Sequence, residues 1–148
     1  MNPLSVAKVL VVDDEEIARK NLHYILKKEG YTVVIAASGE EALDKMKTSN
    51  FDVVLTDIRM ENISGFDVLE RTKSKYPETE VVMVTAYAST DSAMESLKKG
   101  AFSYIAKPFK IDEIRVTVRQ AIAKKLSNHI LNSKQSKEIL RQEGSLKG

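Results

Sequence analysis

The chain has 148 residues, of which 43% are hydrophobic and 30% are charged, a balance that suits one globular domain. Its net charge of +2 favours neither a nucleic-acid-binding nor a membrane-surface protein. The lack of cysteine excludes disulfides and thiolate metal sites and agrees with a reducing cytosol. The opening residues MNPLSVAK show no signal-peptide pattern, and no apolar run approaches the roughly 20 residues of a membrane span. We therefore expect a soluble, cytoplasmic, single-domain protein.

Five short runs rich in valine, isoleucine and leucine recur along the chain. They are Lys8–Val12, Thr32–Ala36, Val53–Thr56, Val81–Val84 and Phe102–Ile105. Several of these runs are continuously apolar, which is typical of strands that are buried on both faces of a parallel sheet.

Segments with apolar residues at helical spacing lie between the runs. The first ends at Gly30, and the second opens with Ser38 and Glu41 at the spacing of a capping box. The third follows Gly65 and ends at Tyr76.

A fourth helix is expected over about 91–99, with Met94 and Leu97 facing inward, and a fifth begins near Asp112. Strand and helix therefore alternate five times. Right-handed crossovers place helices on both faces of such a sheet, so we expect a doubly wound α/β fold. Ligands bind at the carboxyl ends of the strands in folds of this kind.

Polar side chains follow several of the predicted strands where each one ends: Asp13, Asp14, Asp57, Thr85 and Lys107. Three carboxylates at one edge repel one another unless a proton or a cation is shared between them. Oxygen ligands suit Mg²⁺, and the absence of a His or Cys cluster argues against zinc. Asp13 and Asp14 also fit a role as helix caps, and Lys107 or Thr85 alone would be an ordinary surface residue. The functional interpretation depends on all five residues meeting at one edge.

Four motifs in order, VVDDE (Val11–Glu15), TDIRM (Thr56–Met60), VTAY (Val84–Tyr87) and YIAKPF (Tyr104–Phe109), together resemble the CheY-like receiver domains of bacterial response regulators. The resemblance covers roughly residues 6–126, and it implies a five-stranded parallel sheet in the order 2-1-3-4-5 with five helices.

The family's functional roles then carry over to matching positions. The resemblance implies that Asp57 accepts a phosphoryl group. It also implies that Asp14, Asp57 and the backbone carbonyl of Arg59 bind Mg²⁺ directly, and that Asp13 contacts the ion through water. No other cofactor is expected. The activity would be limited to self-phosphorylation and autodephosphorylation, without turnover of a separate substrate.

The remaining roles concern the switch. Lys107 would pair with Asp57 and then with the phosphate. The Lys107–Pro108 bond would be cis, in the manner of this family. Thr85 would bind a phosphate oxygen, and Tyr104 would follow by turning inward.

The resemblance implies that Arg59 and Tyr87 stand at positions that tune the lifetime of the phosphoryl group. Glu61 departs from the family, which commonly has proline there.

The resemblance implies that a sensor histidine kinase is the phosphodonor and that partners dock on the face formed by the fourth helix, fifth strand and fifth helix. A homodimer would form through this face or through the C-terminal helix. Residues 127–148 are expected to form a helical extension or a linker like that of NtrC-type transcription activators, so the chain is either part of a longer regulator with an output domain or a stand-alone receiver. A weak heptad pattern that begins at Ile122 and continues into this region leaves open a coiled coil or a solvated helix. Its positions are Ile122, Leu126, His129, Ser133, Ser136 and Leu140.

Rival functions find less support in the sequence. A haloacid-dehalogenase-type phosphatase requires a second aspartate where this chain has Arg59, and glycine-rich nucleotide-binding motifs are missing. The full set of polar residues argues against a pseudo-receiver. No helix-turn-helix follows the fifth helix, so direct DNA binding is not expected. His23 and His129 are interpreted as surface residues.

Overall fold

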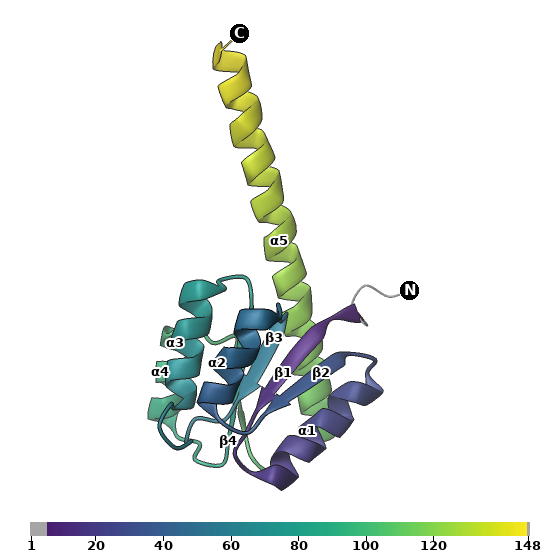
Figure 1. Ribbon diagram of the computed structural model, residues 1–148, viewed down its shortest axis with the longest axis vertical. Coiled ribbons are helices and arrows are strands. Elements are labelled where there is room, and N and C mark those ends of the chain that lie inside the picture. Colours follow the sequence, from purple (N-terminus) through teal and green to yellow (C-terminus); the bar gives the residue numbers. More distant parts are fainter. Residues whose placement is uncertain (1–5, 148) are drawn as a thin grey trace.

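The computed structural model describes residues 6–147, apart from the side chains of Ser136 and residues 143–147. The expectation about the N-terminal leader rests partly on residues 1–5, which lie outside this range. The elements in chain order are β1 (Lys8–Val12), α1 (Glu16–Lys28), β2 (Thr32–Ala36), α2 (Gly39–Thr48), β3 (Val53–Thr56), α3 (Gly65–Lys75), β4 (Glu80–Thr85), α4 (Thr90–Lys98), β5 (Ser103–Ala106) and α5 (Ile111–Lys147) (Figure 1).

All five strands are parallel, and their order is β2-β1-β3-β4-β5, which confirms the expected doubly wound sheet. The first three strands have the bounds that the apolar runs predicted. β4 is one residue longer at each end, and β5 begins and ends one residue later than expected. Because the strands are parallel and in close register, their carboxyl ends lie along one edge.

Two hydrophobic clusters form the core, one on each face of the sheet. Val9 and Val11 of β1 belong to the cluster beneath α1 and α5, whereas Leu10 and Val12 belong to the cluster beneath α2 and α3. Successive side chains of a strand point to opposite faces, so a strand covered on both faces needs apolar residues at every position. This requirement explains why β1 is a continuous apolar run.

The orientation of α4 differs from the expectation that Met94 and Leu97 face inward. Met94 is 65% exposed and Leu97 is 55% exposed, while Ser96 is the residue that α4 buries. The Ser96 hydroxyl donates a hydrogen bond to the backbone oxygen of Ser92, so its polar atom is satisfied inside the helix. The face with small side chains therefore packs against the sheet, and the two large apolar side chains point outward.

The N-termini of α2 and α3 are both capped by serine. Ser38 accepts a hydrogen bond from the backbone of Glu41, but the Glu41 carboxylate accepts from Ala37, so only half of the expected capping box forms. Ser64 and Asp67 form a complete box at the start of α3.

α5 is one helix of 37 residues that crosses the domain and continues beyond it as an isolated rod (Figure 1). Of the heptad positions, Ile122 is buried and Leu126 packs against the core, so these two face the body of the domain. The Ser136 side chain lies outside the described residues, and Leu140 is exposed. Within residues 6–147, no helix is long and apolar enough to cross a membrane.

Candidate functional site

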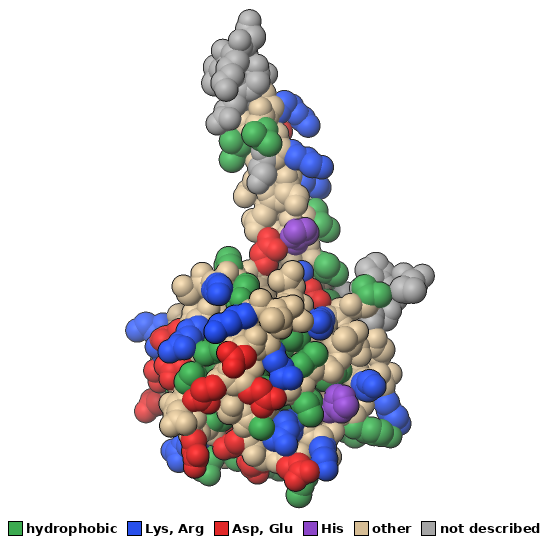
Figure 2. All heavy atoms as spheres, in the orientation of Figure 1, with side chains coloured by type: hydrophobic (Ala, Val, Ile, Leu, Met, Phe, Trp, Pro, Cys, Tyr) green, Lys and Arg blue, Asp and Glu red, His purple; other side chains and the backbone are tan. Residues whose placement is uncertain are grey.

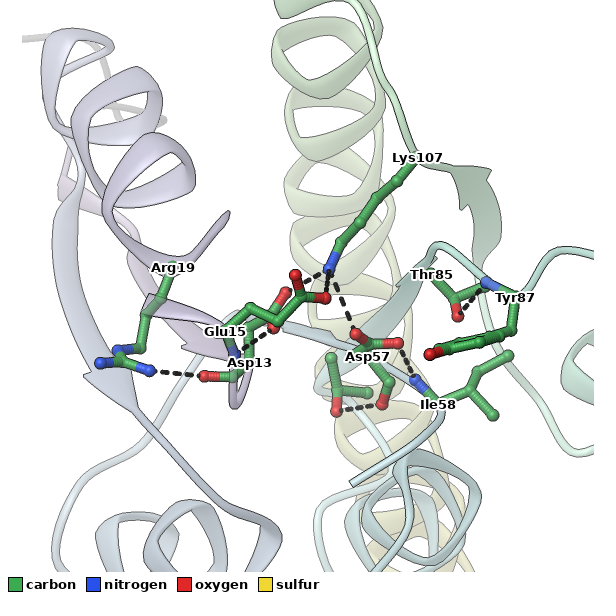
Figure 3. Close-up of polar contacts among 9 residues, drawn as sticks. Asp13, Glu15, Arg19, Asp57, Ile58, Thr85, Tyr87 and Lys107 are labelled. Carbon is green, nitrogen blue, oxygen red and sulfur yellow. Dashed lines mark hydrogen bonds and ion pairs between the residues drawn. The ribbon is translucent and has the colours of Figure 1, made fainter. Parts of the chain in front are cut away.

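The carboxyl edge of the sheet brings three of the strand-end residues into direct contact. Asp13 follows β1, Asp57 follows β3 and Lys107 follows β5, and Figure 3 shows the Lys107 side chain reaching across the edge toward both aspartates. They are separated by up to 94 residues in the sequence, so this contact depends entirely on the strand order.

Asp57 is almost completely buried, and hydrogen bonds hold both its backbone and its carboxylate. Only 2% of the residue is exposed, and its backbone N–H donates to the oxygen of Val12 at 3.0 Å. The N–H of Ile58 donates to Asp57 Oδ1 at 2.7 Å, and Lys107 Nζ donates to Oδ2 at 3.1 Å. Both carboxylate oxygens therefore have a donor, and both donors would still favour negative charge if a phosphoryl group were attached.

Lys107 is also bound to Asp13, at 2.7 Å between Nζ and Oδ2. Burial lowers the pKa of Lys107, but its hydrogen bond with Asp13 and the nearby Asp13 and Asp57 charges outweigh burial and raise the pKa above its usual value. Burial raises the pKa of Asp13, which is 1% exposed, against the opposing effect of Lys107. The ammonium group thus compensates two buried carboxylates that would otherwise repel each other.

Four acidic residues, Asp13, Asp14, Glu15 and Asp57, place one carboxylate oxygen each within 4.8 Å of one another. Asp14 and Glu15 are exposed to solvent, so water molecules can complete a coordination shell. An all-oxygen donor set that is open on one side fits a hard divalent cation such as Mg²⁺. Such an ion would compete with Lys107 for the oxygens of Asp13 and Asp57.

The mouth of the site is covered by a cation–π contact between Arg59 and Tyr87. The guanidinium carbon lies 4.1 Å from the ring centre, and both residues line a cavity of about 330 Å³ together with Asp14 and Asp57. A larger groove of about 480 Å³ lies between the C-terminal ends of α2 and α3. These helix ends are remote in sequence and topology from the strand-end carboxylates, so chemistry and not size identifies the site.

Thr85 and Tyr104 occupy the neighbouring strands β4 and β5. Thr85 is fully buried, and its hydroxyl oxygen accepts a hydrogen bond from the backbone of Tyr87 at 3.1 Å (Figure 3). The Tyr104 hydroxyl lies 2.6 Å from the hydroxyl of Ser92 and accepts from the N–H of Ser89 at 3.2 Å. Tyr104 is therefore attached to the first turn of α4.

Two residues near the site were not singled out from the sequence. Arg19 of α1 donates to the backbone oxygen of Asp13 at 2.8 Å, and Glu15 lies 3.6 Å from Lys107 Nζ (Figure 3). Glu15 adjoins the aspartate pair, so its proximity was foreseeable. The contact of Arg19 requires the turn between β1 and α1 to fold back, which the spacing alone does not indicate.

The loop after Asp57 returns tightly to its own start. Asn62 has a φ of 64°, a conformation that asparagine tolerates better than most residues, and the N–H of Gly65 donates to the oxygen of Ile58 at 2.8 Å. A Cβ atom at Gly65 would lie 1.9 Å from the backbone oxygen of Asp57. Glycine is thus required where α3 begins against the acceptor's own backbone. The Lys107–Pro108 bond at the other side of the site is cis.

A sheet with this order and an acidic edge closed by a lysine is the arrangement expected from the resemblance to receiver domains, a class of phosphoacceptor signalling domains. The comparison with protein families is specific: residues 9–119 match the response regulator receiver domain. The chain belongs to this family, and phosphoacceptor function follows from that membership.

Individual relatives support the same assignment. The chain is 40% identical over 115 residues to the transcriptional regulatory protein ZraR of Klebsiella oxytoca, covering 78% of this chain and 26% of that protein. It is 39% identical to sporulation initiation phosphotransferase F of Bacillus subtilis, covering 76% of this chain and 91% of the relative. The structure of the beryllofluoride-activated NtrC4 receiver domain dimer matches with a TM-score of 0.76 and 34% identity, covering 80% of this chain and 98% of that one. The chain thus spans about a quarter of the length of the ZraR-type regulators.

Proposed function

We propose that Asp57 is the phosphoacceptor of this receiver domain and that a sensor histidine kinase is its donor. The observation that carries the proposal is Lys107, whose ammonium group lies between the buried carboxylates of Asp13 and Asp57 at the carboxyl edge of the sheet. The Lys107 ammonium group offsets the negative charge of the Asp57 carboxylate and would also offset the charge of a phosphoryl group attached to it.

In the transfer, a carboxylate oxygen of Asp57 forms a bond to phosphorus while the bond from phosphorus to the donor breaks, and the donor leaves with that electron pair. Phosphoryl transfer requires positioning and compensation of charge on the phosphoryl oxygens more than covalent assistance. Lys107 supplies positive charge 3.1 Å from Asp57 Oδ2, and the N–H of Ile58 fixes the other oxygen. Both groups act without rearrangement of the backbone.

We propose Mg²⁺ as the cofactor. Asp13, Asp14 and Asp57 would hold it, with the backbone carbonyl of Arg59 as a further ligand and Asp13 acting through water. When bound, the ion would neutralise charge on the acceptor and on the phosphoryl group. The oxygen-only donor set supports this choice over zinc.

Arg59 and Tyr87 are proposed to set the lifetime of the phosphoryl group. Their stacked side chains line the cavity above Asp57, where a hydrolytic water must enter. Autodephosphorylation would then be the only turnover, with no separate substrate.

Thr85 and Tyr104 are proposed to carry the signal. The Thr85 hydroxyl accepts a hydrogen bond from Tyr87 and can still donate one to a phosphate oxygen. Tyr104 holds the first turn of α4 through Ser92, so its movement would alter the exposed α4 surface. A nearly complete switch requires on the order of 5 kcal/mol of differential stabilisation.

The face formed by α4, β5 and α5, or the helical extension, is the proposed surface for a second copy or an output domain. Exposed Met94 and Leu97 support the first of these surfaces, and the dimeric NtrC4 receiver structure supports self-association. We propose that the receiver comprises residues 6–126, that residues 127–148 connect it to an output domain, and that this chain itself binds neither DNA nor a membrane. A cytoplasmic location suits a domain that takes phosphate from a histidine kinase.

Incubation with acetyl phosphate and Mg²⁺, followed by intact mass measurement, tests the proposal. One phosphate should be gained by the wild type and by Asp44→Asn, which alters an exposed carboxylate on α2, but not by Asp57→Asn. EDTA should prevent the gain. Phosphorylation of Asp57→Asn at the wild-type rate would refute the assignment.

A further inference from the structure

A second group of charged and polar residues lies at the opposite edge of the sheet, where the strands begin. On the body of the domain it consists of Asp52 before β3, Glu78 in the loop before β4, and Glu80 at the start of β4. On α5 it consists of Lys124, Lys125, His129 and Asn132. We call these seven residues the clamp. The phosphoacceptor site uses none of them.

Asp52 and Glu78 each form short contacts with side chains of α5. Lys125 Nζ lies 2.8 Å from Asp52 Oδ1, and the other oxygen of Asp52 accepts from the N–H of Lys8 at 2.8 Å. Asp52 thus joins α5 to the start of β1. The two oxygens of Glu78 meet different residues of α5, His129 Nδ1 at 3.0 Å and Asn132 Nδ2 at 3.1 Å.

Glu80 forms the buried centre of the clamp. It is 2% exposed, and its Oε2 has no hydrogen bond within the described part of the chain. Lys124 of α5 lies 3.8 Å from this oxygen, and Lys73 of α3 lies 4.0 Å from the other. A buried carboxylate is costly unless cations stand nearby, so Glu80 favours the position of α5 that keeps Lys124 close.

The residues of α5 that face the body form one stripe with spacing of four and three: Val118, Ile122, Lys125, His129 and Asn132. Such spacing keeps side chains on one side of a helix. The stripe is apolar while α5 covers the sheet and becomes polar as α5 passes the edge. His129 and Asn132 therefore complement Glu78, and Figure 2 shows a histidine beside acidic side chains where the rod leaves the body.

We propose that this sheet edge is an intramolecular docking surface for residues 124–132 of α5, which makes the root of the helical extension a rigid part of the receiver. The part of α5 that projects from the body of the domain then begins after Asn132, about two turns beyond residue 126. Because α5 begins just after Lys107 and crosses the whole domain, a shift of α5 at the signalling face would swing the extension as one lever (Figure 1).

Spin labels at Lys47→Cys on α2 and Lys137→Cys on the extension test this joint, since the chain has no native cysteine and both side chains are exposed. Labelled protein is diluted into unlabelled protein so that only distances within one chain are measured. The wild type should give one narrow distance distribution. Glu78→Ala/Lys125→Gln should broaden it, while Glu138→Ala, which alters an ion pair within the extension, should not.

Hydrogen exchange provides the second readout. Amides of residues 126–132 should exchange about three- to tenfold faster in the double variant, because exposed and half-exposed polar contacts are individually weak but act together here. Amides of β1 and β3 should be unchanged, which shows that the variant is folded. A wild-type distribution as broad as that of the double variant, or no effect of the double variant on either measurement, would overturn the proposal.

Discussion

Substitution of Gly65 by alanine should damage both the fold and the acceptor, because the new methyl group would meet backbone atoms. The Cβ would lie 1.9 Å from the Asp57 oxygen, 2.7 Å from its carbonyl carbon and 2.8 Å from the Cα of Ile58. Ordinary contacts of this kind are longer than 3 Å, so the loop must move by more than about 1 Å. No side-chain rotation can relieve the contact.

Three contributions set the size of the effect. Overpacking costs about 1–3 kcal/mol or more. Displacement also weakens the hydrogen bond from Gly65 to Ile58, which is worth about 1 kcal/mol. Alanine's higher helix propensity at the start of α3 offsets about 0.5–1 kcal/mol. The net loss of unfolding free energy should be about 1–3.5 kcal/mol, or about 3–11 °C in melting temperature for a chain of this length.

Gly39→Ala supplies a graded control. Its Cβ would lie 2.7 Å from Cγ2 of Ile63, the end of a side chain that can shift, although the Ile63 oxygen is also close at 2.9 Å. We expect a loss of about 1–2 kcal/mol in urea denaturation and a phosphorylation rate within about threefold of wild type. Gly65→Ala should slow phosphorylation by acetyl phosphate at least about tenfold. The steric reasoning would be refuted if the stability of Gly65→Ala were within about 0.5 kcal/mol of wild type. It would also be refuted if Gly39→Ala were less stable than Gly65→Ala.

Three further predictions concern the site. Burial raises the pKa of Asp13, so its ionisation costs stability as pH rises from about 4 through the folded pKa. Asp13→Asn should therefore be about 1 kcal/mol more stable than wild type in metal-free urea denaturation at pH 7, and this gain should shrink at pH 3. A loss of stability in Asp13→Asn at pH 7 would contradict this reasoning. Tyr104→Phe removes the contacts with Ser89 and Ser92 and should lower unfolding free energy by about 0.5–1.5 kcal/mol, whereas after Ser92→Ala the same change should cost less; equal costs would show that the contact contributes nothing. Arg59→Ala and Tyr87→Ala should each speed loss of phosphate by about two- to tenfold, and the double variant should gain less than the product of the two, because each single change already breaks the stack; unchanged dephosphorylation would contradict the shielding role.

Much of the fold follows from the sequence because parallel strands buried on both faces must be continuously apolar. β1, β2 and β3 have the predicted bounds for this reason, whereas β4 also includes Glu80 and Thr85, polar residues that are buried at its two ends. Helical spacing predicted α4 but not its orientation. Met94 and Leu97 share one side of the helix, and the spacing does not reveal that the opposite, small-residue side is the one that packs.

The contact among Asp13, Asp57 and Lys107 could be predicted because residues that follow parallel strands meet at the carboxyl edge of the sheet. This prediction depends only on strand direction and order. The stack of Arg59 on Tyr87 depends on side-chain rotamers in two loops. Such rotamers are set by tertiary packing and leave no periodic trace in the sequence. The clamp was hidden for a related reason, since its charges look like those of any solvated helix until the sheet edge is in place.

Reduction of the phosphorylated protein with borohydride tests the central assignment most directly. Borohydride converts an aspartyl phosphate to homoserine, which peptide mass mapping places at a single position. After treatment with acetyl phosphate and Mg²⁺, homoserine should appear at position 57 alone, and it should be absent without phosphodonor. Homoserine at Asp13 or Asp14, or a phosphorylated protein with an unmodified Asp57, would contradict the account.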